Sequence, residues 1–500
     1  MFWNVVMYLG IDLGTSGLKA ALMDDAGNII DTKSAALSVN SPNPLWSEQN
    51  PLDWWSAVES VIDQLSQSHI VSQIKAIGLS GQMHGATLLD EAGSVIRPAI
   101  LWNDGRCQAQ CLEIEGVVSD SRILTGNIMM PGFTAPKLLW VKNNEPEHFK
   151  RIHKVLLPKD YLRFRLCGTF FSDMSDASGT MWMNTRERCW DESLLAACGL
   201  TKKHMPELVE GPQVTGTLLP ELAQKWGMDE IPIVAGAGDN AAGAIGVGLT
   251  EPGQGMISLG TSGVYFVVAD QFSSFPEKAV HSFCHALPDR WHLMSVMLSA
   301  ASCLDWFAKS VLGKDVPAVL SLLENEDGPS KNAPFFLPYL SGERTPHNDP
   351  NASGAFIGLT HQHSTKDMAY AVLEGVCFAM ADGVDAVHAS GTTANDICLI
   401  GGGTKSAYWR QMMADILNLK LSYKQGGDVG PALGAARLAQ LGTCENSQVQ
   451  NVCGSPPLVD THNPNAEHHQ VYQRRRNVFV SLYPAIQQAV SPLSQTSTER

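Results

Sequence analysis

The stretch Gly10-Ile11-Asp12-Leu13-Gly14-Thr15-Ser16-Gly17 decides the fold, because its last five residues recur at residues 259–263. Each copy follows an apolar run and precedes another run of apolar or β-branched residues, which predicts strand, glycine turn, strand. Glycine lets backbone N–H groups crowd around an anion, and Thr and Ser add hydroxyl donors. Two such turns predict two related halves that face a shared polyphosphate. The alternative is a coincidental repeat of five small residues in a chain with 44 glycines.

The length and the charge of the chain limit its class. Five hundred residues exceed one ordinary core, so two domains are expected. Hydrophobic residues make up 44% of the chain and charged residues 17%, as is typical of a globular protein. The formal net charge of −15 argues against nucleic acid or a membrane as partner. The basic run Arg474-Arg475-Arg476 is interpreted as a solvated helix face.

The eleven cysteines are scattered, and none form a C-x-x-C pair. Cys107 and Cys111 lie closest, but they lack a second pair and nearby histidines, so zinc binding is weakly indicated. The odd count and the spread favour a reducing cytosol, and a cytoplasmic protein is expected. No window approaches 18 apolar residues without charge, and the first residues lack the Lys or Arg of a signal peptide.

Strand and helix patterns alternate along both halves. In the first half we expect strands at residues 8–12, 18–23, 74–79, 87–89, 99–102 and 231–235, and helices from Pro51 (capped by Asn50) and at 136–142 (with Thr134 as candidate cap). Residues 147–176 are expected to be irregular. In the second half we expect a strand at 397–400 and helices at 366–387, 407–416 (capped by Ser406), 431–440 and 467–489.

A cluster of Gly248, Pro252, Gly253 and Gly255 marks the boundary between the halves. We therefore expect an N-terminal domain over residues 7–248 and a C-terminal domain over residues 249–490. Residues 1–6 and 491–500 are expected to be an unstructured extension and tail. The sum is an α/β chain of two similar domains with a cleft between them.

Asp12 precedes the first glycine turn, whereas Ser258 precedes the second. A carboxylate beside a phosphate turn would repel the anion unless a cation lies between them, and Mg²⁺ is the natural mediator. The alternative is a capping or turn aspartate without a ligand. The difference between the two repeats favours the magnesium hypothesis.

Asp239 follows the strand at residues 231–235, and the carboxyl ends of strands in open α/β sheets are where ligands bind. A carboxylate there can accept a proton from a substrate hydroxyl. A helix N-cap is the structural alternative. The segment Gly236-Ala237-Gly238-Asp239-Asn240-Ala241 also fits the dinucleotide pattern G-x-G-x-x-A, but an aspartate inside that loop would oppose a pyrophosphate.

Several loops offer binding groups without a complete motif. Gly401-Gly402-Gly403-Thr404-Lys405-Ser406 lies between strand and helix and permits close approach of a ligand, yet it does not satisfy the Walker pattern. Lys19 follows the first turn and is a candidate phosphate contact. Gln82-Met83-His84 and Trp102-Asn103-Asp104-Gly105-Arg106 follow strands and offer donors and acceptors beside apolar faces, as a polyol requires.

Together with these segments, the two glycine turns and Gly238-Asp239-Asn240 resemble the FGGY carbohydrate kinases. The specific segments are Ser80-Gly81-Gln82-Met83-His84-Gly85, Leu101-Trp102-Asn103-Asp104-Gly105-Arg106, Lys159-Asp160-Tyr161 and Ser341-Gly342-Glu343-Arg344-Thr345-Pro346. The similarity covers residues 8–440. It implies a ribonuclease-H-like (actin- and hexokinase-like) core in each domain and a central cleft for ATP, Mg²⁺ and sugar.

The resemblance also implies roles for single residues. Asp239 is expected to be the catalytic base and, with Asp12, a metal ligand. The expected sugar contacts are Gln82, Met83, His84, Trp102, Asn103, Asp104, Asp239 and Asn240. The expected nucleotide contacts are Gly14, Thr15, Ser16, Lys19, Gly260, Thr261, Gly402, Gly403 and Ser406.

The implied reaction is transfer of the ATP γ-phosphoryl group to the terminal hydroxyl of D-xylulose. A kinase of ribulose, glycerol or gluconate remains open, and so does a sugar-sensing protein without catalysis. The loop Gln82-Met83-His84 favours xylulose, and the presence of both Asp12 and Asp239 favours catalysis. A homodimer is expected, and no role is assigned to residues 1–6.

Overall fold

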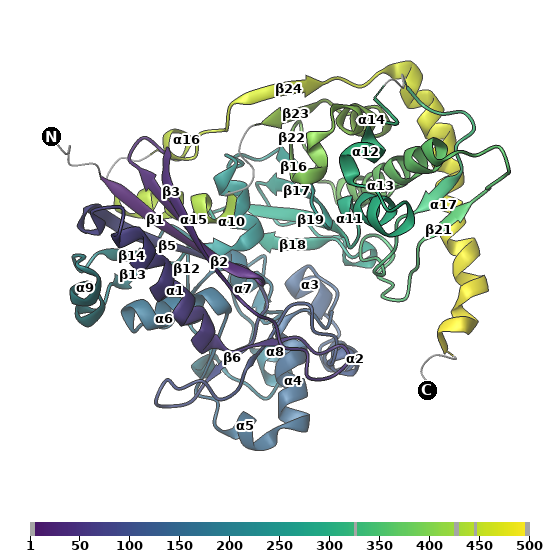
Figure 1. The fold of residues 1–500 in the computed structure, drawn as a ribbon. Coiled ribbons are helices and arrows are strands. Elements are labelled where there is room, and N and C mark those ends of the chain that lie inside the picture. Colours follow the sequence, from purple (N-terminus) through teal and green to yellow (C-terminus); the bar gives the residue numbers. More distant parts are fainter. Residues whose placement is uncertain (1–5, 325–327, 425–429, 445–447, 496–500) are drawn as a thin grey trace.

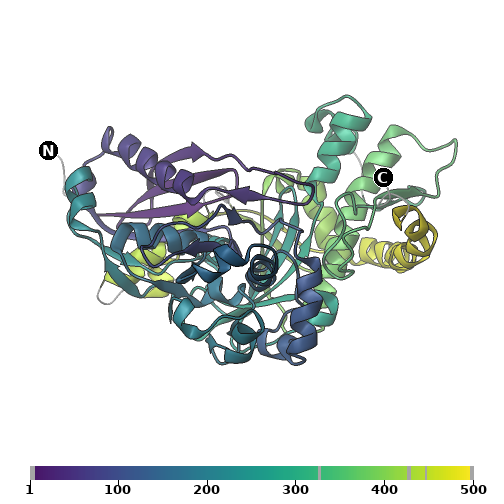
Figure 2. The same cartoon turned by 90° about the horizontal axis from the view of Figure 1, so that it is seen from below.

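The chain folds into two lobes, each built on a seven-stranded sheet (Figure 1). The structure is a computed structural model and describes residues 6–324, 328–424, 430–444 and 448–495. Figure 2 shows the lobes side by side, with the long final helix on the outer side of the second lobe. Across these described ranges, no helix has the length and apolar character needed to cross a membrane.

The first sheet begins with the strands around the first glycine turn. β1 (Met7–Leu13) runs antiparallel to β2 (Gly17–Asp24), and β3 (Ile29–Ala36) extends this meander. β5 (Ile74–Gly81) pairs parallel to β1. Both are buried along nearly their whole length, which explains their continuous apolar composition. The other strands of this sheet are β13 (Val214–Thr217), β14 (Pro232–Val234) and β15 (Ala237–Gly238).

The second sheet repeats this arrangement around the second glycine turn. β16 (Gln254–Leu259) runs antiparallel to β17 (Gly263–Ala269) and parallel to β22 (Asp396–Ile400). The shared pattern confirms the predicted α/β fold with two similarly built domains. The other strands of this sheet are β18 (His281–Cys284), β19 (Trp291–Met297), β23 (Leu421–Lys424) and β24 (Leu458–His462).

Helices flank both sheets. α1 (Pro51–Ser66) begins as predicted, because Asn50 caps it by accepting a hydrogen bond from the Leu52 amide. In the second lobe, Ser406 caps α14 as predicted by accepting from the Trp409 amide. The long helices of this lobe are α13 (Thr365–His388), α14 (Ala407–Leu417) and α17 (Ala466–Gln495).

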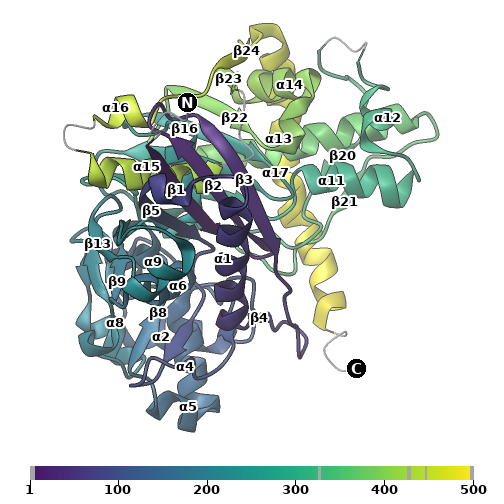
Figure 3. The ribbon, with the colours of Figure 1, turned by 60° about the vertical axis from the view of Figure 1, so that its left-hand side comes forward.

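Helix α15 (Gly430–Thr443) belongs by sequence to the predicted C-terminal domain, but it packs on the first sheet. It contacts β1, β2, β5 and α10 (Asp239–Gly246) of the first lobe. Figure 3 shows it beside β1 and β5. A Cβ on Gly10 would lie 1.9 Å from the Ala432 carbonyl oxygen, and a Cβ on Gly78 would lie 1.9 Å from that of Ala435. Glycine at both strand positions lets the helix approach. The sequence shows these small residues but not the sheet they face.

The stretch 147–176, predicted to be irregular, is a series of short elements. They are α5 (Pro146–Lys150), β8 (Lys154–Leu156), α6 (Pro158–Cys167), β9 (Phe171–Asp173) and α7 (Met174–Ser178). The prediction was wrong because Lys159, Asp160 and Arg163 of α6 are charged yet fully buried, paired with one another. A polar composition therefore concealed a buried segment.

Smaller predictions also differ at element ends. Phe133, and not Thr134, is the N-cap of α4 (Thr134–Asn144), while the Thr134 hydroxyl donates to the His84 carbonyl. The strand at 99–102 shortens to β7 (Ala99–Ile100), because Leu101 enters a turn. Helix α17 continues to residue 495, since an established helix gains one hydrogen bond per added residue. Residues 1–5 and 496–500 lie outside the described residues.

The basic run on α17 is mostly a docking contact and only partly a solvated face. Arg475 pairs with the buried carboxylate of Glu374 at 2.7 Å, and Arg476 pairs with Asp382 and Asp385. Of these three arginines, Arg474 is exposed, and Arg475 and Arg476 are half-buried. Two of the three arginines therefore fasten α17 to α13, because the acidic residues of α13 face them.

Candidate active site

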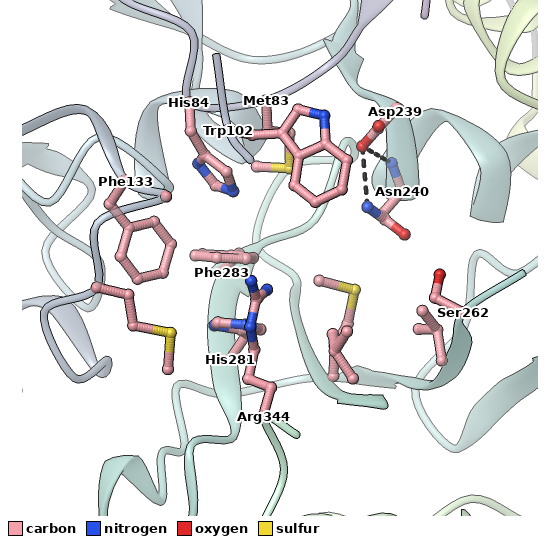
Figure 4. A pocket seen from close by; sticks show the side chains of 15 residues that line it. Met83, His84, Trp102, Phe133, Asp239, Asn240, Ser262, His281, Phe283 and Arg344 are labelled. Atoms are coloured by element: carbon pink, nitrogen blue, oxygen red, sulfur yellow. Dashed lines mark hydrogen bonds between the residues drawn. The ribbon is translucent and has the colours of Figure 1, made fainter. Parts of the chain in front are cut away.

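A cavity of about 270 Å³ lies between the two lobes, next to the end of β5 and the start of α10 (Figure 4). The first lobe lines it with Met83, His84, Trp102, Asp239 and Asn240, and the second lobe with Ser262, His281, Phe283 and Arg344. Five of the eight predicted sugar contacts therefore face one space. Donors and acceptors alternate there with aromatic rings and thioethers, an arrangement suited to a small polyhydroxylated ligand.

Asp239 is the first residue of α10 and lies on the cavity wall. Its Oδ1 accepts hydrogen bonds from the Asn240 amide at 2.7 Å and from the Asn240 side chain at 2.9 Å. Burial and the nearby Asp12 charge raise the pKa of Asp239 to about 7. A carboxylate with such a pKa is matched to proton transfer near neutral pH.

Asp12 lies in β1, opposite Lys19 of β2 and Ser80 of β5. Burial raises the pKa of Asp12 to about 6, against the opposing effects of the Ser80 hydroxyl and the Lys19 charge. Lys19 is therefore placed beside Asp12, as its position after the first turn allows, and it does not line the cavity.

The two carboxylates fit a divalent cation. Asp12 Oδ1 is buried and has no hydrogen-bond partner among the described residues. Within the same residues, no group of three or more His, Cys, Asp or Glu could enclose a metal without other ligands. Mg²⁺ uses one or two carboxylates and completes its shell with phosphate oxygens and water. The donor set thus suits Mg²⁺ bound together with a phosphate chain.

The first glycine turn is fixed from the cavity side. The Thr15 hydroxyl accepts a hydrogen bond from Trp102 Nε1 at 2.9 Å and donates to Gln82 Oε1 at 3.0 Å. Gln49 Nε2 donates to the Thr15 carbonyl at 2.7 Å, and the Gly14 amide closes the turn on Gly17. The predicted phosphate turn and the predicted sugar loops therefore form one connected network.

Three predicted sugar contacts lie outside the cavity. Gln82 is buried and bridges Thr15 and Gln49, so it supports the turn. Asp104 accepts from the Ser47 amide at 2.6 Å and pairs with Arg106, which fixes its loop. Asn103 is exposed and does not line the cavity. The loop sequence contains polar groups, but their direction depends on tertiary partners.

His84 has a strained backbone, with φ at 70°. Its carbonyl accepts from Lys137 Nζ at 2.9 Å and from Thr134, which holds this conformation. Burial and the Lys137 charge lower the pKa of His84 to about 3, so the ring is neutral. Since Nδ1 contacts the Gly179 carbonyl at 2.9 Å, Nδ1 carries the proton, and Nε2 remains an acceptor for a ligand hydroxyl.

The wall from the second lobe was missed at the sequence level. Arg344 Nη1 donates to His281 Nε2 at 3.3 Å, and Phe283 follows on the same strand, β18. Burial lowers the pKa of His281 well below its usual range, and burial also lowers the pKa of Arg344. Arg344 stands in the segment 341–346 that supports the family resemblance, which was the one available signal.

A second cavity, of about 660 Å³, lies in the second lobe. It is lined by Gly260, Thr261, Gly402, Gly403 and Ser406, together with Ala301, Ser302 and Trp409 among others. Five predicted nucleotide contacts therefore surround one space, although the Ser406 hydroxyl also caps α14. Thr261 faces this cavity whereas Ser262 faces the smaller one, so the second glycine turn lies between the two.

Comparison with known proteins agrees with this geometry. Residues 7–246 match the N-terminal domain of the FGGY family of carbohydrate kinases, and residues 255–442 match its C-terminal domain. The chain belongs to the FGGY family of carbohydrate kinases.

Two similar relatives are xylulose kinases. The chain is 56% identical to xylulose kinase from Escherichia coli (strain K12), covering 95% of this chain and 98% of the relative. It is 53% identical to xylulose kinase from Klebsiella pneumoniae, and the match covers 97% of this chain and 100% of the relative. The crystal structure of the kinase from Brucella ovis matches with a TM-score of 0.93 at 45% identity, covering 97% and 100%. The structure of glycerol kinase from Plasmodium falciparum with ADP matches with a TM-score of 0.87 at 21% identity, covering 95% of this chain and 98% of that chain. This likeness shows the fold alone.

Proposed function

We propose that this chain transfers the γ-phosphoryl group of ATP to the terminal hydroxyl of D-xylulose, giving D-xylulose 5-phosphate and ADP. The observation that supports it most is the placement of Asp239 on a sugar-sized cavity in a chain 56% identical to a xylulose kinase. The second cavity and the glycine turn between the two cavities supply a separate place for a nucleotide.

In this proposal Asp239 is the general base. Its Oδ1 is occupied by Asn240, so Oδ2 takes the proton from the sugar hydroxyl. The hydroxyl oxygen forms a bond to the γ-phosphorus while the bond from that phosphorus to the bridging oxygen breaks, which releases ADP. Catalysis then consists mainly of alignment and of charge stabilisation by backbone donors of the two turns.

Asp12 would hold Mg²⁺, with Asp239 as the second candidate carboxylate. The bound ion would neutralise phosphate charge during transfer. Gly14, Thr15, Ser16, Gly260 and Thr261 would face the phosphates, and Gly402 and Gly403 the adenosine. The shared cavity of residues 260, 261, 402 and 403 supports the second part of this assignment, whereas residues 14–16 line neither of the two cavities.

The far wall of the cavity would select the keto end of the sugar. Figure 4 shows Arg344 and His281 on the wall across from Asp239. With the terminal hydroxyl at Asp239, the carbonyl end of xylulose extends toward this wall. The Arg344 guanidinium offers donors there, which suit a carbonyl oxygen.

Gluconate is the second candidate acceptor, because of the same arginine. The Glu343 charge acts on Arg344, but burial raises the pKa of Glu343 to about 8, so the carboxylate of a sugar acid could pair with the guanidinium. A gluconate kinase from Lactobacillus acidophilus also matches, at 27% identity and a TM-score of 0.90. The much higher identity to xylulose kinases favours the ketose.

A substrate panel in a coupled ADP assay tests the proposal. We expect the highest kcat/KM with D-xylulose, lower values with ribulose, glycerol and gluconate, and no turnover when Mg²⁺ is withheld. Asp239→Ala is expected to lower kcat by at least a hundredfold while ATP binding persists. A higher kcat/KM with another acceptor would contradict xylulose as the substrate. Near-normal turnover of Asp239→Ala would contradict the role of Asp239 as general base.

We also propose a cytoplasmic location and a homodimeric state. All eleven cysteines lie in the described part of the chain and none forms a disulfide, which supports a reducing compartment. Light scattering after size-exclusion chromatography measures the mass in solution, and a monomeric mass would contradict the dimer.

A further inference from the structure

Helix α7 (Met174–Ser178) lies behind the cavity and is hydrogen-bonded to three of its walls. At its start, Ser175 Oγ accepts from the Gly238 amide at 3.2 Å, directly before Asp239. At its end, the Gly179 carbonyl accepts from His84 Nδ1 at 2.9 Å. On a third side, Ser178 Oγ accepts from the Cys284 amide at 3.0 Å, where β18 ends. One short helix therefore connects the base, the sugar loop and the wall from the second lobe.

The helix itself rests on a buried ion cluster. Asp173 caps α7 by accepting from the Ser175 amide at 2.8 Å, and its Oδ2 also accepts from the Ser175 hydroxyl. Its other oxygen pairs with Lys159 Nζ at 2.7 Å, and Lys159 also pairs with Asp160 at 2.6 Å. A continuous path thus runs from Lys159 through Asp173 and Ser175 to the backbone that enters Asp239. None of these side chains lines the cavity.

The cluster places two cations among three carboxyls. Lys159 and Arg163 are the cations, and Asp160 and Asp173 are their partners. The third carboxyl, Asp176, lies 3.6 Å from Lys159 Nζ, and burial raises the pKa of Asp176 well above its usual range. Burial alone would lower the pKa of Lys159, but the charges of Asp160, Asp173 and Asp176 outweigh this effect and raise that pKa. The Lys159 ion pair therefore holds Asp173, and through it the start of α7, in place.

We propose that Ser175 is a positioning residue for Asp239, and that Ser178 positions the β18 wall of the sugar cavity. The proposal rests on the proposed role of Asp239 as base. Gly238 immediately precedes that base, so a shift of its amide moves the carboxylate relative to the sugar hydroxyl. A misplacement of about 1 Å costs on the order of a hundredfold in rate. The Ser175 hydroxyl is the group that fixes this amide.

Ser172 provides a matched control. It is equally buried and belongs to the same cluster, but its hydroxyl donates to Asp160 at 2.6 Å and does not reach Gly238. We expect Ser175→Ala to lower kcat roughly tenfold with unchanged KM for ATP and xylulose. Ser172→Ala should lose a similar amount of thermal stability yet keep kcat within about twofold. Ser175→Thr, which retains the hydroxyl, should recover most of the rate.

A double-mutant cycle separates positioning from general damage. If Ser175 acts through Asp239, Ser175→Ala should change the residual rate of Asp239→Ala less than about twofold. Ser178→Ala should instead raise the KM for xylulose about fivefold at similar kcat, because it loosens a binding wall. Should Ser175→Ala fail to fold, Ser175→Cys is used, since its thiol is a weak acceptor and the same fall in kcat is expected.

The outcomes distinguish this proposal from the proposed function. Near-normal turnover of Asp239→Ala would overturn the role of the base, whatever Ser175 does. A large loss in Asp239→Ala with equal kcat for Ser175→Ala and Ser172→Ala would overturn the positioning role alone. An undiminished Ser175→Ala effect in the Asp239→Ala background would also overturn it.

Discussion

Asp239 is placed where its own charge is disfavoured, and this sets the pH at which it can work. Burial and the Asp12 charge raise its pKa to about 7. A general base acts only when deprotonated, so kcat/KM is expected to fall about tenfold per pH unit below pH 7. A pH profile of kcat/KM for xylulose between pH 5 and 9 measures this fall. A flat profile down to about pH 5 would contradict a base with this pKa.

Because Asp239 is buried, its ionised form destabilises the folded protein. A carboxyl whose pKa is raised in the fold binds its proton more tightly there than in the unfolded chain, so folding stability is lost as pH rises from about 4 to about 7. Asp239→Asn should therefore raise Tm by roughly 1–3 °C at pH 8 and much less at pH 4.5. Scanning calorimetry of the ligand-free protein gives both values. An equal shift at the two pH values would contradict this origin.

Arg344 should discriminate between acceptors by the group at the far end of the cavity. Arg344→Met removes the donors that face a carbonyl, so kcat/KM for xylulose is expected to fall about 10- to 100-fold. The weak activity with glycerol, which has no carbonyl, should change little. The ratio of the two kcat/KM values measures selectivity, and equal losses with both substrates would assign Arg344 to stability instead.

Single catalytic residues could be predicted from the sequence only where a motif lay at the end of a predicted strand. Asp12 and Asp239 could be selected because the first lies at the end of a predicted strand and the second follows one, each beside glycines. Gln82 and Asp104 occupy equally suggestive loops, yet their partners turn them into the protein. His281 comes from the other lobe, and no local pattern indicates which wall it faces.

At the scale of elements, the contact between α15 and the first sheet depends on the absence of side chains. An added Cβ on Gly78 would lie 1.9 Å from a carbonyl oxygen of α15, and the backbone there cannot move away freely. Gly78→Ala should destabilise the protein by about 3 kcal/mol or more. Urea unfolding measures the loss.

Gly116 is the control for this substitution. It lies in α2 (Gln108–Val117), has no atom within 4 Å of an added Cβ, and its neighbours are partly exposed. Gly116→Ala should be neutral or stabilise by up to about 1 kcal/mol, because alanine favours a helix. If the Gly78 variant were as stable as the Gly116 variant, the helix would have to shift from the sheet at little cost.

Elements with a regular apolar pattern were predictable, and those with buried charge were not. The cap and the apolar face of α1 are visible in its sequence, and so is the capping serine of α14. Helix α6 contains charged residues that are fully buried, because Lys159 and Arg163 pair with Asp160. Sequence patterns assume that charge faces water, so a neutralised cluster in the interior escapes them.

On the scale of the whole molecule, the duplicated sheets create one site from two lobes. The smaller cavity needs walls from both lobes, whereas the larger cavity lies within the second lobe. In the proposed function, a sugar in the smaller cavity would link the lobes, and ATP would reach it across the second glycine turn. Duplication could be predicted from the repeated turn, but the assignment of α15 to the first sheet could not, since it requires a long-range contact.

Because the two cavities have different walls, substitution of one aromatic residue is predicted to weaken the binding of only one ligand. Phe283 lines the smaller cavity, which we propose for the sugar, and does not line the larger cavity, which we propose for the nucleotide. A ligand that binds only the folded state at a hundredfold excess over its Kd stabilises by about 2.7 kcal/mol. Phe283→Ala should abolish most of the Tm increase produced by xylulose and leave that produced by ATP with Mg²⁺ intact, as measured by scanning fluorimetry. If Phe283→Ala reduced the Tm increase equally for both ligands, the two cavities would not bind independently. Two independent cavities cannot both lose affinity when the substitution changes the wall of only one.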